Sequence, residues 1–124
     1  MLKCRAVLFV GLDETREAEN FDRDGLTLPG LQELLIMEVL KIQPNTVVVM
    51  VHGGPVASPA IRDAVPAVLD AFYPGQHGGI AMVDALFGDY NPGGKMPYTS
   101  CAESNPPFSF VVYADLPSVV LGGE

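Results

Sequence analysis

The chain has 124 residues and a formal net charge of -8, with 48% hydrophobic and 18% charged residues. This length suits one domain with one core, and the composition is that of a globular protein, not of a disordered segment. The acidic balance, Lys+Arg 7 against Asp+Glu 15, argues against nucleic acid and anionic membranes as partners, because both need clustered cations. No apolar run reaches the roughly 18 residues of a membrane-spanning helix, and the start lacks a signal-peptide cleavage pattern.

The two cysteines, Cys4 and Cys101, lie near opposite ends of the sequence and form no metal-ligand spacing. The sequence leaves open whether they form a disulfide, and with it the redox compartment.

Apolar runs and amphipathic segments alternate along most of the chain. Strands are predicted over residues 6–10, 46–51 and 67–72, and helices over 29–41, 59–64 and 78–87. The first strand is a continuous apolar run, typical of a strand buried on both faces. This alternation predicts an α/β fold with a mostly parallel sheet sandwiched between helices. A further strand over residues 108–113 is possible, but its place in the sheet is open.

Each long helix has an expected core-facing stripe. In the first helix the stripe consists of Leu31, Leu34, Leu35 and Val39. In the last helix the expected core contacts are Ile80, Met82, Val83 and Leu86.

Three segments should meet where ligands bind in such a sheet, beyond the carboxyl ends of the strands: residues 11–23, 52–56 and 73–79. The first segment holds five carboxylates, which only Arg16 and Arg23 offset: Asp13, Glu14, Glu17, Glu19 and Asp22. If folding brings them together, their repulsion would keep one or more of them protonated near neutral pH, as a general acid requires. A solvated acidic loop is the alternative.

The other two segments carry weaker signals. His52, at a strand end, could be a base, a sugar ligand or a structural residue. Gly53 and Gly54 match a phosphate-cradling loop only loosely, because the GxGxxG spacing and a Walker lysine are missing. The segment with Gln76 either leads into a helix amino terminus that faces a ligand or is a plain turn.

Four segments in register resemble the carboxy-terminal α/β-sandwich domain of glycoside hydrolase family 3: GLDETREAENFDR, LTLPGLQELL, NTVVVMVHGGPV and FYPGQHGGIAMVDALFGDYNPGGKMPYT. The EAE..DR and LFGDYNPGGKMPYT elements are most similar to its β-xylosidase and β-glucosidase branches. The resemblance divides the chain into a family domain over residues 1–99 and a divergent tail over residues 100–124.

The resemblance implies part of a retaining, exo-acting β-glycosidase that hydrolyses O-glycosyl bonds in β-linked oligosaccharides or glycosides, without cofactor or metal. The family's nucleophile lies on a separate (β/α)8 barrel that this sequence does not contain. The chain would then be a fragment, inactive by itself, of a larger enzyme that is secreted or extracellular. A non-catalytic carbohydrate-binding or scaffold module is the alternative.

The family's Glu-Gly-x-Asp-Arg pattern implies that Glu19 is the general acid/base, with Glu17 as second choice. Asn20 replaces the glycine of that pattern, and asparagine tolerates a positive φ better than most residues. The residues expected to bind or orient the substrate are Asp22, Arg23, His52 and Gln76.

Overall fold

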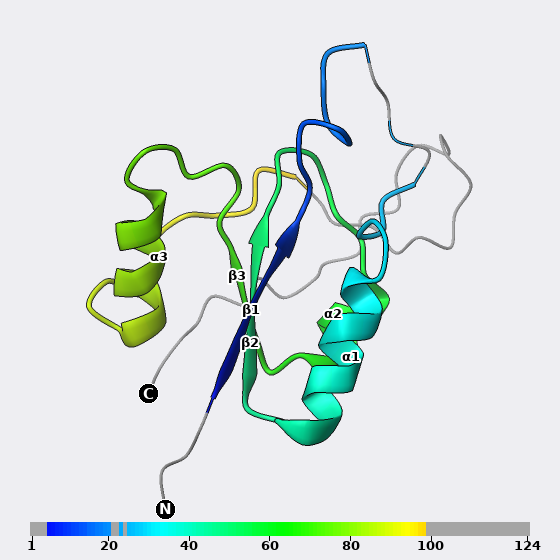
Figure 1. Ribbon diagram of the computed structural model, residues 1–124. Helices are drawn as coiled ribbons and strands as arrows, with labels where there is room; N and C mark the ends of the chain where they lie inside the picture. Colours follow the sequence, from blue (N-terminus) through cyan, green and yellow to red (C-terminus); the bar gives the residue numbers. More distant parts are fainter. Residues whose placement is uncertain (1–4, 21–22, 24, 99–124) are drawn as a thin grey trace, which may run out of the picture.

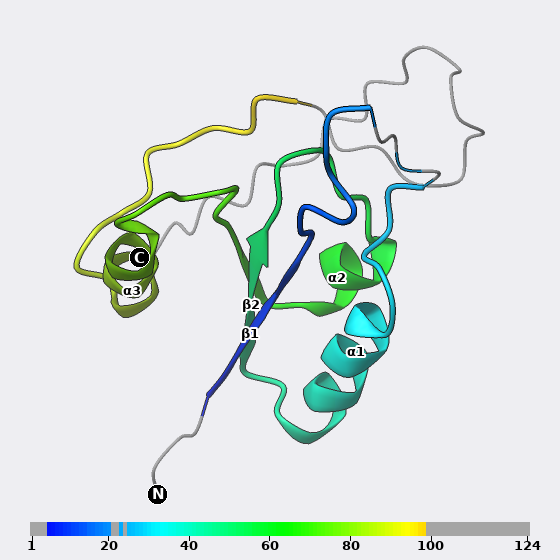
Figure 2. The ribbon, with the colours of Figure 1, turned by 45° about the horizontal axis from the view of Figure 1, so that its top comes forward.

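The computed structural model describes residues 5–20, 23 and 25–98 (Figure 1). Its strands are β1 (Ala6–Gly11), β2 (Thr46–Val51) and β3 (Ala67–Asp70), and its helices are α1 (Gln32–Ile42), α2 (Pro59–Ala64) and α3 (Gly78–Phe87). The strands are parallel and lie in the order β1-β2-β3. Helices α1 and α2 lie on one side of the sheet and α3 on the other, as Figures 1 and 2 both show. This arrangement confirms the predicted α/β fold with a parallel sheet between helices.

The main core fills the space between the sheet and the pair α1 and α2. Val48 and Ile36 are its fully buried members, at 0% exposure. Val10, Met50 and Ile61 complete the contact between the strands and the two helices. Burial of such side chains stabilises the fold by about 1.5–3 kcal/mol each, which makes this layer the main source of stability for the described residues.

Strand β1 is not buried on both faces, contrary to the sequence prediction. Val7 and Phe9 remain 42% and 58% exposed, whereas Val10, on the opposite face, lies in the core. The reason is its position: β1 is an edge strand of the described sheet, and α3 lies away from it. A continuous apolar run therefore did not distinguish an edge strand from a central one.

Helix α1 begins later than predicted and turns a different face toward the sheet. The predicted stripe is wrong for Leu31, Leu34 and Leu35, which are exposed. The buried side follows Gln32, Ile36 and Leu40, which are spaced by four residues. Gln32 accounts for this rotation, since its side-chain amide accepts from Gly11 N at 2.7 Å and donates to Gly11 O at 3.0 Å.

The remaining elements agree more closely with the sequence. In α2, the Ser58 hydroxyl caps the helix by accepting from Ile61 N at 3.3 Å, and Pro59 occupies its first turn. Strand β3 ends at Asp70, two residues earlier than predicted, and Phe72 then has a left-handed backbone with φ 50°.

Helix α3 has the predicted bounds but not the predicted packing. Ile80 and Val83 are 65% and 50% exposed, while Met82 and Leu86 are half-buried. Within the described chain, the backbone of α3 approaches no other helix or strand closely, which leaves part of the predicted stripe exposed.

Several sequence predictions fall on residues that lie outside the described ones: Cys4, Cys101, Asp22 and the possible strand over residues 108–113. The predicted domain boundary at residue 99 likewise stays a prediction. None of the described helices is both long and apolar enough to cross a membrane.

Candidate active site

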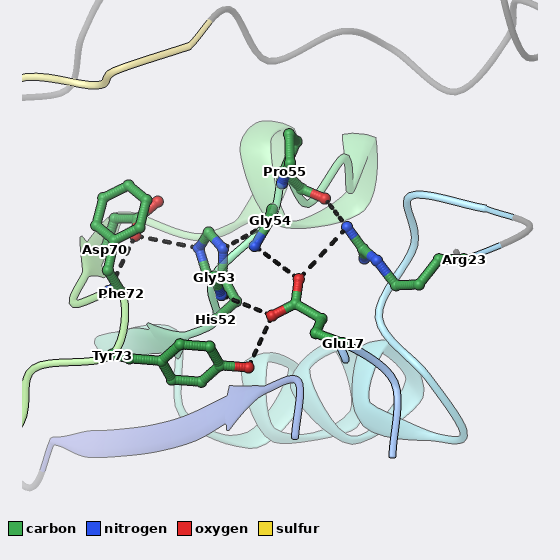
Figure 3. Close-up of polar contacts among 9 residues, drawn as sticks. All are labelled: Glu17, Arg23, His52, Gly53, Gly54, Pro55, Asp70, Phe72 and Tyr73. Atoms are coloured by element: carbon green, nitrogen blue, oxygen red, sulfur yellow. Dashed lines mark hydrogen bonds and ion pairs between the residues drawn. The ribbon is translucent and has the colours of Figure 1, made fainter. Parts of the chain in front are cut away.

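The loops after β1, β2 and β3 meet around the side chain of Glu17, as Figure 3 shows. Glu17 comes from the first loop, Gly53 and Gly54 from the second, and Tyr73 from the third. This confirms the prediction that the three segments at the carboxyl ends of the strands come together.

Both oxygens of the Glu17 carboxylate are engaged. Oε2 accepts from Gly53 N at 2.7 Å and from the Tyr73 hydroxyl at 2.7 Å. Oε1 accepts from Gly54 N at 2.6 Å and lies 3.8 Å from Arg23 Nη2. One carboxylate thus links three loops. Its side chain is only 14% exposed to solvent.

These contacts keep Glu17 ionised. Burial acts to raise the pKa of Glu17, but hydrogen bonds from Tyr73, Gly53 and Gly54 and the nearby Arg23 charge outweigh it, so the pKa lies below its ordinary value. In turn, donation to this carboxylate raises the pKa of Tyr73 to about 12. A carboxylate held in this way is poorly suited to deliver a proton.

The two glycines allow the carboxylate to approach the backbone. A Cβ at Gly53 would lie 2.8 Å from Tyr73 Cε2, and one at Gly54 would lie 2.8 Å from Glu17 Oε1. Their amides thus bind an internal anion, and the phosphate-cradling interpretation of Gly53-Gly54 loses its donors.

The anchor is the Glu17 carboxylate together with its partners Gly53, Gly54, Tyr73 and Arg23. His52 lies next to this anchor, with its side chain 0% exposed. Its Nδ1 is 2.7 Å from the Gly54 carbonyl oxygen, and its Nε2 is 3.1 Å from Asp70 Oδ1, off the direction of a linear N–H hydrogen bond. Burial acts to lower the pKa of His52, but Asp70, Gly54 and the Glu17 charge outweigh it and raise the pKa. His52 therefore orients the loop after β2, and it offers a sugar no side-chain surface.

Glu19 lies on the same loop as Glu17, but its side chain is not held by any described residue. It is exposed, and within the described residues it has no hydrogen bond or ion pair. Asn20 beside it has φ 63°, the left-handed conformation expected where the family pattern has glycine. Among the described residues, Glu19 is thus an exposed, unpaired carboxylate on the loop that follows β1.

The other predicted site residues lie in different surroundings. Arg23 joins the anchor: its Nη2 also donates to the Pro55 carbonyl oxygen (Figure 3). Gln76 is exposed in the turn before α3, and no described contact links it to Glu17. Among the described residues, no group of His, Cys, Asp and Glu side chains is arranged to hold a metal ion.

Sequence reasoning missed Asp70 and the role of Tyr73. Asp70 is not near His52 in the sequence, but the parallel register pairs it with Met50, two residues before His52. Counting along the two predicted strands would have indicated this contact. For Tyr73, the aromatic residue in the turn after the third strand was the available signal.

Comparison with known proteins places the chain in a family. Residues 5–115 match the model of the glycosyl hydrolase family 3 C-terminal domain. The chain is 46% identical over 96 residues to the probable β-D-xylosidase 7 of Arabidopsis thaliana, which covers 75% of this chain and 12% of that protein. It is also 46% identical over 94 residues to the thermostable β-glucosidase B of Acetivibrio thermocellus, covering 76% of this chain and 12% of that protein.

Solved structures agree with this match. A β-glucosidase from Kluyveromyces marxianus, crystallised with glucose, superposes with a TM-score of 0.73 at 38% identity, covering 77% of this chain and 11% of that one. The chain thus spans about 12% of the length of the curated relatives it matches. It belongs to glycoside hydrolase family 3, in which it corresponds to the C-terminal domain.

Proposed function

We propose that this domain supplies the general acid/base of a retaining, exo-acting β-glycosidase that acts on β-xylosides or β-glucosides. Glu19 is the acid/base in this proposal. The observation that carries it is the contrast between two carboxylates on one loop: Glu17 is bound on both oxygens, whereas Glu19 is exposed and unbound within the described residues.

The chemistry needs a second protein domain. A retaining glycosidase uses two carboxyl groups about 5–5.5 Å apart, one as nucleophile and one as acid and then base. Glu19 would protonate the leaving oxygen while the nucleophile binds the sugar, and would then take a proton from the attacking water. We assign the nucleophile to a (β/α)8 barrel outside this chain. We expect Asp22 to flank Glu19, whereas Arg23 contacts Glu17 and Pro55.

The test uses a chimera in which residues 5–98 replace the matching segment of the Acetivibrio thermocellus β-glucosidase. Glu19→Gln should lower kcat about 10²–10⁴-fold on glycosides with poor leaving groups. On aryl glycosides with good leaving groups, which depart without a proton, azide should restore turnover and give the β-glycosyl azide, because it attacks the glycosyl-enzyme without needing a base. Glu38→Gln, on the exposed side of α1, is the matched control and should leave kcat unchanged.

Two results would contradict the assignment. One is azide rescue of Glu17→Gln in place of Glu19→Gln, which would make Glu17 the acid/base. The other is robust turnover of aryl β-xylosides or β-glucosides, with retention, by the 124-residue chain alone, which would show that no barrel is needed.

A further inference from the structure

We propose that Glu17 is a positioning residue for Glu19: its carboxylate fixes the loop after β1 against the loops after β2 and β3. This inference rests on the proposed function, since it gives Glu17 a part in the work of Glu19. It concerns a residue that touches neither the sugar nor the reacting atoms.

The first step is the way the loop is held. Its start is fixed by the backbone: Leu12 N donates to Val51 O at 2.9 Å, and Glu17 N donates to Asp13 O at 3.0 Å. Asp13 Oδ1 closes the turn by accepting from Thr15 N at 2.9 Å. Ala18 then forms a β-bridge through the backbone, so Glu17 provides the last described side-chain anchor before Glu19.

The second step is the lack of a substitute for the carboxylate. Gly53 N and Gly54 N converge on Glu17, and each needs an acceptor of its own. Glutamine has one acceptor oxygen and a donating amino group in place of the second oxygen, so it satisfies one amide and opposes the other. Aspartate retains the charge but is shorter by one methylene, so it cannot reach both amides from the same backbone.

The third step is the sensitivity of acid catalysis to geometry. A misplacement of about 1 Å can lower a rate about 10²-fold. The Glu19 side chain has no polar contact of its own within the described residues, so its position depends on the loop backbone, which the Glu17 side chain and the β-bridge at Ala18 hold. A loop released at Glu17 would leave Glu19 chemically intact but wrongly placed.

The test compares Glu17→Gln with Glu38→Gln in the chimera described above. We expect Glu17→Gln to lower kcat about 10–100-fold with KM changed less than threefold. Azide should give no rescue, because the acid/base itself is still present. Tyr73→Phe removes a single hydrogen bond from an exposed hydroxyl, so it folds normally and should lower kcat in the same direction by less.

A second measurement uses the 124-residue chain itself. In its amide NMR spectrum, Glu17→Gln should move the Gly53 and Gly54 signals upfield and broaden or shift those of residues 18–20, while Glu38→Gln should do neither. Unchanged signals at residues 18–20, or kcat equal to that of Glu38→Gln, would overturn the positioning role. If Glu19→Gln shows no azide rescue while these NMR changes occur, the anchor stands and the acid/base assignment fails.

Discussion

The imidazole of His52 bridges two loop ends below the surface: Nδ1 lies 2.7 Å from the Gly54 carbonyl oxygen, and Nε2 lies 3.1 Å from the Asp70 carboxylate. Gly54 also donates its N–H to Glu17. The same residue therefore contacts the His52 imidazole through its carbonyl oxygen and the Glu17 carboxylate through its amide. The order of the site thus depends on the His52–Asp70 pair as well as on the exposed loop.

The contact with Asp70 predicts how His52 titrates. Its pKa is raised, with Asp70 as the main favourable cause against burial, and Asp70→Asn should lower the pKa of His52. The measurement is an NMR titration of the ring proton in a His77→Gln background, which leaves one histidine in the chain. An unchanged midpoint in the Asp70→Asn variant would show that the 3.1 Å contact does not exist in solution.

The same shift makes stability depend on pH. A raised folded pKa means that the contribution of His52 is fully present below its unfolded value, near 6.5, and is lost as pH rises through the folded pKa. The free energy of unfolding should therefore fall between neutral and mildly alkaline pH. Asp70→Asn should flatten that slope, as denaturant unfolding at a series of pH values would reveal.

Glu17 predicts the opposite dependence at acid pH. Its folded pKa lies below its ordinary value of 4.5, so its contribution is present above that value and is lost as pH falls through the folded pKa. Glu17→Gln should lower stability by about 1–3 kcal/mol at pH 7, because one glycine amide loses its acceptor. The loss should shrink toward pH 3, and a loss equal at pH 7 and pH 3 would rule out the charge as its cause.

Gly11 is predicted to tolerate no side chain. A Cβ there would lie 1.8 Å from the Val51 carbonyl oxygen, so Gly11→Ala must separate the ends of β1 and β2. We expect a loss of about 3 kcal/mol or more, measured by urea unfolding. Gly79→Ala is the matched control, since its Cβ meets open space in α3 and should stabilise the helix by about 0.5–1 kcal/mol.

Gln32 is predicted to contribute to the stability of the fold, although it is polar and lies at the first position of a helix. Gln32→Ala removes both of its hydrogen bonds to Gly11 and should cost about 1–3 kcal/mol. The exposed Gln76→Ala should change stability by less than about 0.5 kcal/mol. Equal unfolding midpoints for the two variants would contradict the role given to Gln32.

The order of elements could be predicted from the sequence because it depends on local signals. The run of valines in β2, Ser58-Pro59 at the start of α2 and Gly88 at the end of α3 mark boundaries through propensity and capping. The meeting of three loops followed from the parallel topology alone. The family resemblance then placed the acid-rich loop at the site.

Side-chain orientation could not be predicted in the same way. Apolar residues occupy most of α1, so several stripes fit its periodicity, and the contact of Gln32 with Gly11 selected the one through Ile36. Glu17 and Glu19 are the same residue type, and they differ only in their polar contacts: Glu17 meets the loops after β2 and β3, and Glu19 meets no described residue. The contacts of His52 with Asp70 and of Glu17 with Tyr73 join segments that are distant in sequence.

The Gln32 contact has a consequence for the side of β1 that pairs with no described strand. The side-chain amide of Gln32 hydrogen-bonds to both the N–H and the carbonyl oxygen of Gly11, as the peptide of a neighbouring strand would. Any strand added along β1 would have to stop short of residue 11. Growth of the sheet in that direction would therefore leave the acidic loop outside the ladder.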